Sequence, residues 1–265
     1  MLEVNKLLLL FFLMLCWRHQ CPGQKINDIE FIAEVDSSVQ KYIELLPKKF
    51  DSLKVYDLAI GLHGHGSDRW QFAVHDRPEC SAFRAFAEKY DMLAITPDYR
   101  AKTSWMGPQA ESDMIQIVRK LKDKYKINRI FLIGGSMGGT SALTFAALYP
   151  ELISGAVSLN GHVNFLEYDR FQEAISESFG GSKQEIPEEY KRRSAEYWPE
   201  NIVMPVAFTI GMRDTIIPPV SIIRFANVLN EIGKEVWLDQ DESRGHETDF
   251  DSALTAMEFI EYKTR

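Results

Sequence analysis

Cysteine is scarce in this sequence, and no cysteine pair is expected to cross-link the folded chain. Only Cys16, Cys21 and Cys80 occur among 265 residues, and the first two lie in an N-terminal segment that we expect to be removed. A single remaining cysteine excludes an internal disulfide framework. The chain must therefore rely on a buried core, for which its hydrophobic fraction of 45% is sufficient.

Basic clusters are lacking as well. The formal net charge is −8, and no run of lysine and arginine or basic amphipathic stretch offsets it. This composition argues against nucleic acid as a partner. The sequence also contains no internal repeat and no low-complexity segment. Its length fits one large domain, or at most two small ones.

The N-terminal apolar run is too short to span a membrane comfortably. Leu7–Leu15 follows Met1–Lys6 and precedes a polar stretch, which is the pattern of a secretory signal peptide. We expect a signal peptide over residues 1–23, cleaved after Gly23, and a mature domain over residues 24–265. A lipoprotein signal fits less well, because neither cysteine of this segment follows a small residue. The expected localisation is secreted or periplasmic, with no stable membrane insertion after cleavage.

Strand and helix patterns alternate along the rest of the chain. Segments 31–36 and 39–46, joined by a turn at 36–38, predict an antiparallel hairpin. Later strands are predicted at 55–62, 92–97, 130–133, 153–159, 204–210 and 235–238. Helices are predicted at 80–90, 114–125, directly after residue 136, at 220–232 and at 250–262. Repeated strand–helix units imply an α/β fold with a largely parallel sheet and helices on both faces.

Residues 161–203 interrupt this alternation. The insert is polar and carries several aromatic residues, Tyr168 among them. The plainer interpretation is a set of surface helices whose aromatic side chains pack against the domain. The functional interpretation is a small cap that supplies one wall of a substrate pocket. The two interpretations are compatible.

The glycine-rich turn around Ser136 is the stretch most indicative of chemistry. Residues 134–138 fit the G-x-S-x-G nucleophile elbow between a strand and a helix. Glycines two residues on either side of the serine avoid clashes with neighbouring elements. The helix that follows directs backbone N–H groups towards negative charge near the serine. Without catalytic partners, the same pattern is also compatible with a turn that has no catalytic role.

A serine becomes a nucleophile when a histidine and a carboxylate support it. Asp214 follows the strand expected at 204–210, and His246 follows the strand expected at 235–238. Both therefore lie at carboxyl ends of parallel strands, as Ser136 does. Either could be an ordinary loop residue, but the order Ser136, Asp214, His246 predicts a catalytic triad on this architecture. The weaker candidates for the base or the acid are His162, Glu200 and Asp241.

Two backbone N–H groups are expected to stabilise the oxyanion. Met137 supplies one, because it follows the nucleophile. The other is assigned to His65, which lies in a glycine-rich loop after the strand 55–62.

The same loop admits a metal-binding alternative. His63, His65 and Asp68 faintly resemble the H-x-H-x-D-H loop of metallo-β-lactamase-like hydrolases. Ser67 stands where that pattern requires aspartate, and the remaining histidines complete no recognisable metal set. We therefore expect no metal.

Together these motifs resemble the α/β-hydrolase superfamily. The resemblance rests on Leu62–Gly66, Gly134–Gly139, Gly211–Asp214 and Gly245-His246, and it covers about residues 29–262. It implies an α/β-hydrolase fold with a mostly parallel eight-stranded sheet, a Ser-His-Asp triad and no cofactor.

Within the superfamily, two subfamilies are similar to this chain. The Ser-Met-Gly-Gly elbow and the His-Gly-x-Gly loop resemble secreted carbohydrate and feruloyl esterases of the esterase D type. Segments 194–202 and 214–219 are similar to the catalytic domain of prolyl-oligopeptidase-family serine peptidases. The sequence shows no propeller ahead of the domain, which favours an esterase.

The function expected from sequence is a secreted serine hydrolase that cleaves carboxylic esters, with acylated carbohydrates as one substrate class. The alternatives are a serine peptidase of the prolyl-oligopeptidase type that acts on short peptides, and an inactive binding protein on the same scaffold. The expected partner is a small-molecule or carbohydrate ester. Substrate contacts are expected from Trp105, His63 and Tyr168.

Overall fold

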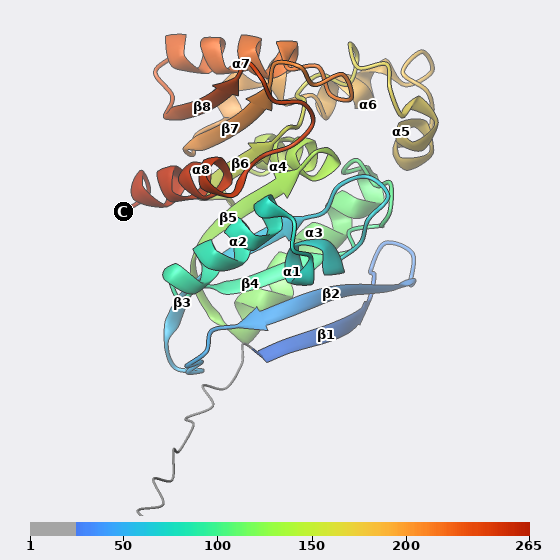
Figure 1. The fold of residues 1–265 in the computed structure, drawn as a ribbon. Helices are drawn as coiled ribbons and strands as arrows, with labels where there is room; N and C mark the ends of the chain where they lie inside the picture. Colours follow the sequence, from blue (N-terminus) through green and yellow to red (C-terminus); the bar gives the residue numbers. More distant parts are fainter. Residues whose placement is uncertain (1–24) are drawn as a thin grey trace, which may run out of the picture.

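The computed structural model describes residues 25–265 and is built on one eight-stranded sheet (Figure 1). The strand order is β1-β2-β4-β3-β5-β6-β7-β8, in which β2 is antiparallel to both β1 and β4 and all other neighbours are parallel. The strands are β1 (Lys25–Ile32), β2 (Val39–Leu46), β3 (Val55–Leu62), β4 (Leu93–Pro97), β5 (Lys126–Gly135), β6 (Gly155–Leu159), β7 (Val206–Gly211) and β8 (Val236–Asp241). The predicted α/β-hydrolase architecture is confirmed, whereas the expected signal peptide at 1–23 lies outside the described residues.

Helices cover both faces of the sheet (Figure 1), which explains why the middle residues of the central strands are buried and mostly apolar. Alternate strand residues face opposite layers. Ala59 packs in the core cluster of one face, and its neighbour Leu58 packs in that of the other. The first face carries α2 (Pro78–Lys89) and α8 (Phe250–Tyr262), and the second carries α3 (Pro108–Lys124), α4 (Met137–Leu148) and α7 (Val220–Glu231).

The first strand lies earlier in the chain than predicted. It spans Lys25–Ile32, and not 31–36, and it pairs with β2 over its whole length. The turn begins at Ala33, whose carbonyl accepts the Ser37 N–H at 2.8 Å. Asp36 then accepts the Ser38 N–H at 3.0 Å. These local hydrogen bonds draw residues 33–38 out of the strand.

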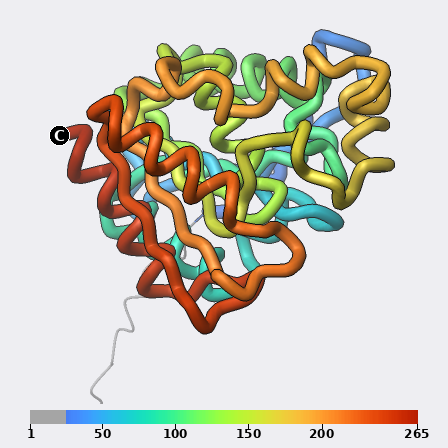
Figure 2. The backbone as a smooth tube through the Cα atoms, turned by 90° about the horizontal axis from the view of Figure 1, so that it is seen from above, coloured from blue at the N-terminus to red at the C-terminus, as the bar shows by residue number. Residues whose placement is uncertain are grey.

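The insert 161–203 folds into short helices at one side of the domain. Figure 2 shows them in yellow and orange, on the side away from the C-terminus. Arg193 in this insert is fully buried, and its guanidinium lies 2.6 Å from the carboxylates of Glu111 in α3 and Glu189 in the insert. This ion-pair network joins the insert to the body of the domain. The elements of the insert are α5 (Gln172–Phe179), α6 (Pro187–Arg192), η1 (Ala195–Tyr197) and η2 (Pro199–Asn201).

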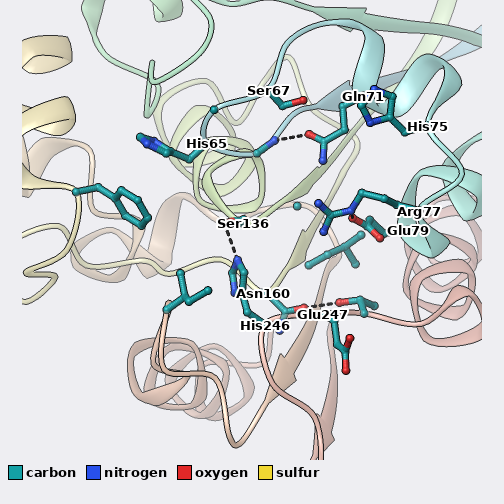
Figure 3. A pocket seen from close by; sticks show the side chains of 17 residues that line it. His65, Ser67, Gln71, His75, Arg77, Glu79, Ser136, Asn160, His246 and Glu247 are labelled. Carbon is teal, nitrogen blue, oxygen red and sulfur yellow. Dashed lines mark hydrogen bonds and ion pairs between the residues drawn. The ribbon is translucent and has the colours of Figure 1, made fainter.

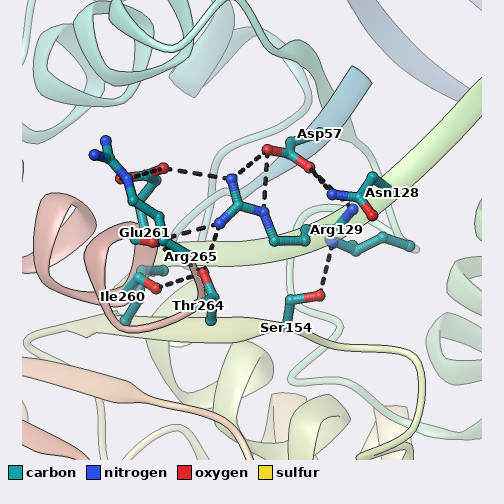
Figure 4. A network of polar contacts seen from close by, with 9 residues as sticks. Asp57, Asn128, Arg129, Ser154, Ile260, Glu261, Thr264 and Arg265 are labelled. Carbon is teal, nitrogen blue, oxygen red and sulfur yellow. Dashed lines mark hydrogen bonds and ion pairs between the residues drawn. The ribbon is translucent and has the colours of Figure 1, made fainter. Parts of the chain in front are cut away.

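A polar network connects the C-terminal helix to the amino-terminal parts of β3 and β5 (Figure 4). Arg129 of β5 lies 2.6 Å from the carboxylate of Asp57 in β3. The same guanidinium reaches Glu261 of α8 at 3.3 Å and donates to Thr264 at 3.0 Å. This network lies near the amino end of β5, so it anchors α8 without entering the region around Ser136 at the carboxyl end.

Candidate active site

Ser136 stands at the sharp turn between β5 and α4. Its backbone has φ 57° and ψ −120°, a conformation that costs a non-glycine residue energy and is common at functional sites. The Ser136 N–H donates to the carbonyl of Leu159 at the end of β6, at 2.8 Å, and the Ser136 carbonyl accepts the Thr140 N–H at 3.0 Å. The turn is thus fixed by the neighbouring strand and by the helix that it starts.

The two outer glycines of the elbow are required by close packing. A Cβ atom on Gly138 would lie 2.0 Å from the carbonyl oxygen of Leu62, and one on Gly134 would lie 2.2 Å from Gly138 itself. No side chain fits at such distances. The elbow is therefore pressed directly against the end of β3, where the next loop begins.

Asp214 and His246 meet Ser136 at the same edge of the sheet, and Figure 3 shows His246 beside Ser136. His246 Nε2 lies 2.9 Å from Ser136 Oγ, and His246 Nδ1 lies 2.6 Å from Asp214 Oδ2. Asp214 follows β7 and His246 follows β8, so two parallel strands deliver them from the same direction. This arrangement lets Nδ1 donate to the carboxylate while Nε2 accepts the serine proton.

Asp214 is held as a carboxylate by its surroundings. Its burial opposes ionisation, but the hydrogen bond from His246 and two backbone N–H groups outweigh burial, so the pKa of Asp214 is lowered. Those N–H groups belong to Ile216 and Ile217, and they donate to Oδ1 at 2.8 and 2.9 Å. Each oxygen of the carboxylate therefore has its own partners, which fixes the plane that faces His246.

The loop that follows β3 presents His65 beside the serine. The Gly64 N–H donates to Gln71 Oε1 and the Gly66 N–H donates to the Lys102 carbonyl, both at 2.8 Å. These bonds fix the backbone on either side of His65. Within residues 25–265, no acceptor takes the N–H of His65 or that of Met137. Two backbone donors next to Ser136 are therefore free to bind a negatively charged oxygen.

A cavity of about 370 Å³ opens over Ser136 and His246. Figure 3 shows His65 on one side of the serine and Arg77 with Glu79 on the other. Phe171 packs against His65 on the first side, and Ile216 adds a second apolar side chain to the cavity lining. The second side is polar, with His75 and Glu247 beside an Arg77–Glu79 ion pair of 2.6 Å.

None of the three side chains expected to contact substrate lines this cavity, which corrects the sequence interpretation. Trp105 is fully buried and packs beneath the rings of His65 and Phe171, with centroids 5.8 and 5.6 Å away. His63 is buried with its ring nitrogens against the carbonyls of residues 64 and 98, and burial lowers its pKa. Tyr168 is also buried.

The residue that takes the place predicted for Trp105 is Phe171. It lies just before α5 with φ 55° and is 36% exposed. Its ring packs against that of His65 at a tilt of 41°, with the ring centroids 4.3 Å apart. Its aromatic character marked it only as one of many in the insert. Tyr168 donates its hydroxyl proton to the Ile216 carbonyl at 3.2 Å, so it supports the cavity wall from behind. No local sequence pattern indicated Gln71 or Asn160 either, because both act through hydrogen bonds to other loops.

The possible metal ligands of the loop 63–68 do not converge. Over residues 25–265, no group of three or more His, Cys, Asp or Glu side chains is arranged to hold a metal ion. The ring of His65 packs against that of Phe171, with centroids 4.3 Å apart. In the same part of the chain, no helix is long and apolar enough to cross a membrane.

Residues 62–213, more than half of the chain, match the α/β-hydrolase fold family. The chain belongs to this family. The matched region runs from the end of β3 to the residue before Asp214, and so includes the elbow. One curated relative, a homoserine O-acetyltransferase of Methanococcus vannielii, is 49% identical over 47 residues, which is 17% of this chain and 10% of that protein.

Solved structures of both esterases and peptidases share the fold of this α/β hydrolase. A putative dipeptidyl aminopeptidase IV from Bacteroides ovatus matches with a TM-score of 0.71 and 17% identity, over 91% of this chain and 35% of that one. A thermostable esterase matches with a TM-score of 0.69 and 18% identity, over 91% of this chain and 63% of that one. Fluorophosphonate-binding serine hydrolase F of Staphylococcus aureus matches with a TM-score of 0.69 and 16% identity, over 91% of this chain and 99% of that one. The hydrolase thus spans about a third of the first of these proteins and almost all of the last.

Proposed function

We propose that this α/β hydrolase is a serine hydrolase that cleaves carboxylic esters through an acyl-enzyme. The observation that carries the proposal is the pair of hydrogen bonds made by His246. Its Nδ1 lies 2.6 Å from Asp214 Oδ2, and its Nε2 lies 2.9 Å from Ser136 Oγ. Both lie in hydrogen-bond range, so the serine can lose its proton as it attacks.

Each group has a defined part in the proposed reaction. His246 Nε2 takes the Ser136 proton while Oγ bonds to the ester carbonyl carbon, and the N–H groups of Met137 and His65 hold the resulting oxyanion. The tetrahedral intermediate collapses, and the departing alcohol receives the proton from His246. Water then attacks the acyl-enzyme in the same manner, which releases the acid and regenerates Ser136. Asp214 stays ionised and keeps His246 oriented.

The two sides of the cavity support an ester with one apolar and one polar part. Phe171 and Ile216 suit an acyl or aromatic group, while Arg77, Glu79 and His75 offer hydrogen bonds to hydroxyl groups. Acylated carbohydrates have this combination and are the substrate class that we propose. A short peptide is the second candidate, because the carboxylates of Glu79 and Glu247 could hold an ammonium group.

Ser136→Ala tests the proposal directly. The wild-type protein is expected to hydrolyse p-nitrophenyl acetate and to react with a fluorophosphonate probe, and the variant is expected to do neither while keeping its circular dichroism spectrum. Matched acyl esters, acetylated sugars and chromogenic peptide amides then rank the substrates. Comparable turnover of amides and esters favours the peptidase. A folded wild-type protein that binds esters but neither cleaves them nor labels would instead be an inactive binding protein.

We also propose that the protein is exported, on the strength of the signal-like pattern at 1–23. Cys80 is compatible with this, since it is buried and unpaired, and burial raises the pKa of its thiol to about 12. Mass spectrometry of the protein from culture medium or periplasm tests the proposal, with a mature chain that starts at Gln24 as the expected result.

A further inference from the structure

The end of β6 contacts Ser136 and the loop that carries His246. Leu159, its last residue, accepts the Ser136 N–H at 2.8 Å. The next residue, Asn160, turns into the left-handed region with φ 54°, and its own N–H donates to the Thr209 carbonyl of β7 at 2.9 Å. Asn160 is thus held against two strands, with its side chain directed at the loop that carries His246 (Figure 3).

Asn160 binds this loop on both sides of His246. Its Nδ2 donates to the Gly245 carbonyl at 3.5 Å, and its Oδ1 accepts the hydroxyl proton of Thr248. Because the Thr248 proton is used in that bond, the 2.7 Å contact between Thr248 and Thr209 has Thr209 as the donor. Asn160 and Thr248 are 5% and 4% exposed, so these bonds are shielded from competing water.

We propose that Asn160 is a positioning residue for His246, and that its side chain and Thr248 form a clamp that holds the imidazole between Asp214 and Ser136. The inference rests on the proposed function and adds a residue to it. One amide side chain contacts the residue just before His246 and the residue two positions after it, which restricts rotation of the loop about its own axis. A displacement of the imidazole of about 1 Å is enough to lower a rate by one to two orders of magnitude.

Other contacts of this loop lie outside residues 245–248. The Arg213 N–H donates to the Arg244 carbonyl at 2.9 Å, which fixes the chain before Gly245. Asp249 accepts the Ser252 N–H at 2.8 Å and caps α8 beyond Thr248. These bonds anchor the two ends of the loop, while the clamp acts on residues 245–248 themselves.

Substitutions at Thr248 test the clamp. Thr248→Val removes the hydroxyl and keeps the side-chain shape, so we expect kcat for p-nitrophenyl acetate to fall about tenfold with KM within about twofold. Fluorophosphonate labelling should slow in parallel. Thr248→Ser restores the hydroxyl and should recover most of the lost kcat. The matched control is Thr144→Val, which removes a buried hydroxyl bonded to the Arg193 carbonyl at 2.8 Å, away from the cavity. It should leave kcat unchanged.

A second readout does not depend on turnover. The short Nδ1–H bond between His246 and Asp214 should give a strongly deshielded proton signal in NMR spectra of the wild-type protein. Asn160→Gly accommodates the left-handed backbone and deletes both clamp contacts, so this signal should broaden or vanish in that variant and persist in Thr144→Val.

The two proposals fail in distinguishable ways. Wild-type activity and an NMR signal that are unaltered in Thr248→Val and Asn160→Gly would overturn the clamp and leave the proposed function standing. Equal loss of kcat in Thr248→Val and Thr144→Val would also overturn it, because a general loss of stability would explain both. A wild-type protein that neither cleaves nor labels overturns the proposed function, and the NMR comparison still decides the clamp.

Discussion

His246 Nδ1 lies 2.6 Å from Oδ2 of Asp214, whose side chain is almost completely buried. The other carboxylate oxygen is already occupied by the N–H groups of Ile216 and Ile217. The carboxylate therefore cannot rotate without losing backbone hydrogen bonds, and its free oxygen remains directed at the imidazole.

Asp214→Asn should abolish most activity while leaving the fold intact. The amide keeps the shape and can still accept from Ile216 and Ile217, but it no longer stabilises the imidazolium or the required tautomer of His246. A fall in kcat of about 10³- to 10⁴-fold is expected for such a change. Steady-state kinetics with p-nitrophenyl acetate measures it, with the exposed Asp251→Asn as control. Activity of Asp214→Asn within tenfold of wild type would remove Asp214 from the proposed mechanism.

Gly138→Ala should destabilise the protein although alanine is the better helix former. Helix propensity alone favours alanine by about 1 kcal/mol. The new Cβ would lie 2.0 Å from the Leu62 carbonyl oxygen, so the start of α4 must move away from β3. Urea unfolding should show a net loss of about 3 kcal/mol or no folded protein at all. Gly135→Ala is the control, since its Cβ meets nothing closer than 3.8 Å; equal stability of the two variants would contradict this packing.

Glu111 should make the protein sensitive to acid. Its burial opposes ionisation, but hydrogen bonds from Arg192 and Tyr149 and the charge of Arg193 outweigh burial and lower its pKa from 4.5 to about 2. The folded state then binds fewer protons than the unfolded state between pH 2 and 4.5. The contribution of Glu111, on the order of 3 kcal/mol, is complete above pH 4.5 and is lost as pH falls towards 2.

Comparison of wild type with Glu111→Gln measures this contribution. The difference in the free energy of unfolding should be largest at pH 6 and should shrink steadily below pH 4.5. Urea titrations at several pH values provide the data. A difference that does not depend on pH would mean that the carboxylate charge of Glu111 does not stabilise the folded insert.

Phe171→Ala should weaken binding of esters with a bulky apolar group. Phe171 covers part of the cavity wall, and loss of about 1 kcal/mol of apolar contact corresponds to a rise in KM of about fivefold. Acetate esters should be affected less than aromatic esters. Phe250→Ala is the control, because Phe250 is similarly exposed, at 37%, but does not line the cavity. An equal effect on acetate and aromatic esters would mean that the apolar group of the ester does not contact Phe171.

The parts of this molecule that the sequence reveals are those determined by neighbouring residues. The order of strands and helices follows from local hydrophobic periodicity, and the helix at 250–262 is found with the predicted bounds. The elbow around Ser136 is recognisable because its serine and glycines stand within five consecutive residues. Asp214 and His246 could be placed because parallel strands end at one edge of the sheet.

Contacts between distant segments could not be read in this way. Trp105 looks like a substrate contact in a polar loop, yet its burial depends on Phe165 and Tyr168, some sixty residues away. Asn160 is an unremarkable residue after a strand until the loop at 245–248 folds over it. Burial and hydrogen-bond partners of this kind belong to the tertiary structure, and one sequence carries no local pattern for them.

Trp105 packs behind His65 and Phe171, so the cavity wall has exposed residues that tolerate substitution and a buried residue that does not. Phe171 and Ile216 form the outermost layer, so a library that randomises them can search for new ester specificities without disturbing the core. Trp105 is fully buried against the rings of His65 and Phe171, so its replacement would remove packing from both side chains. A directed-evolution campaign on this hydrolase should therefore vary the outer residues and leave the buried tryptophan unchanged.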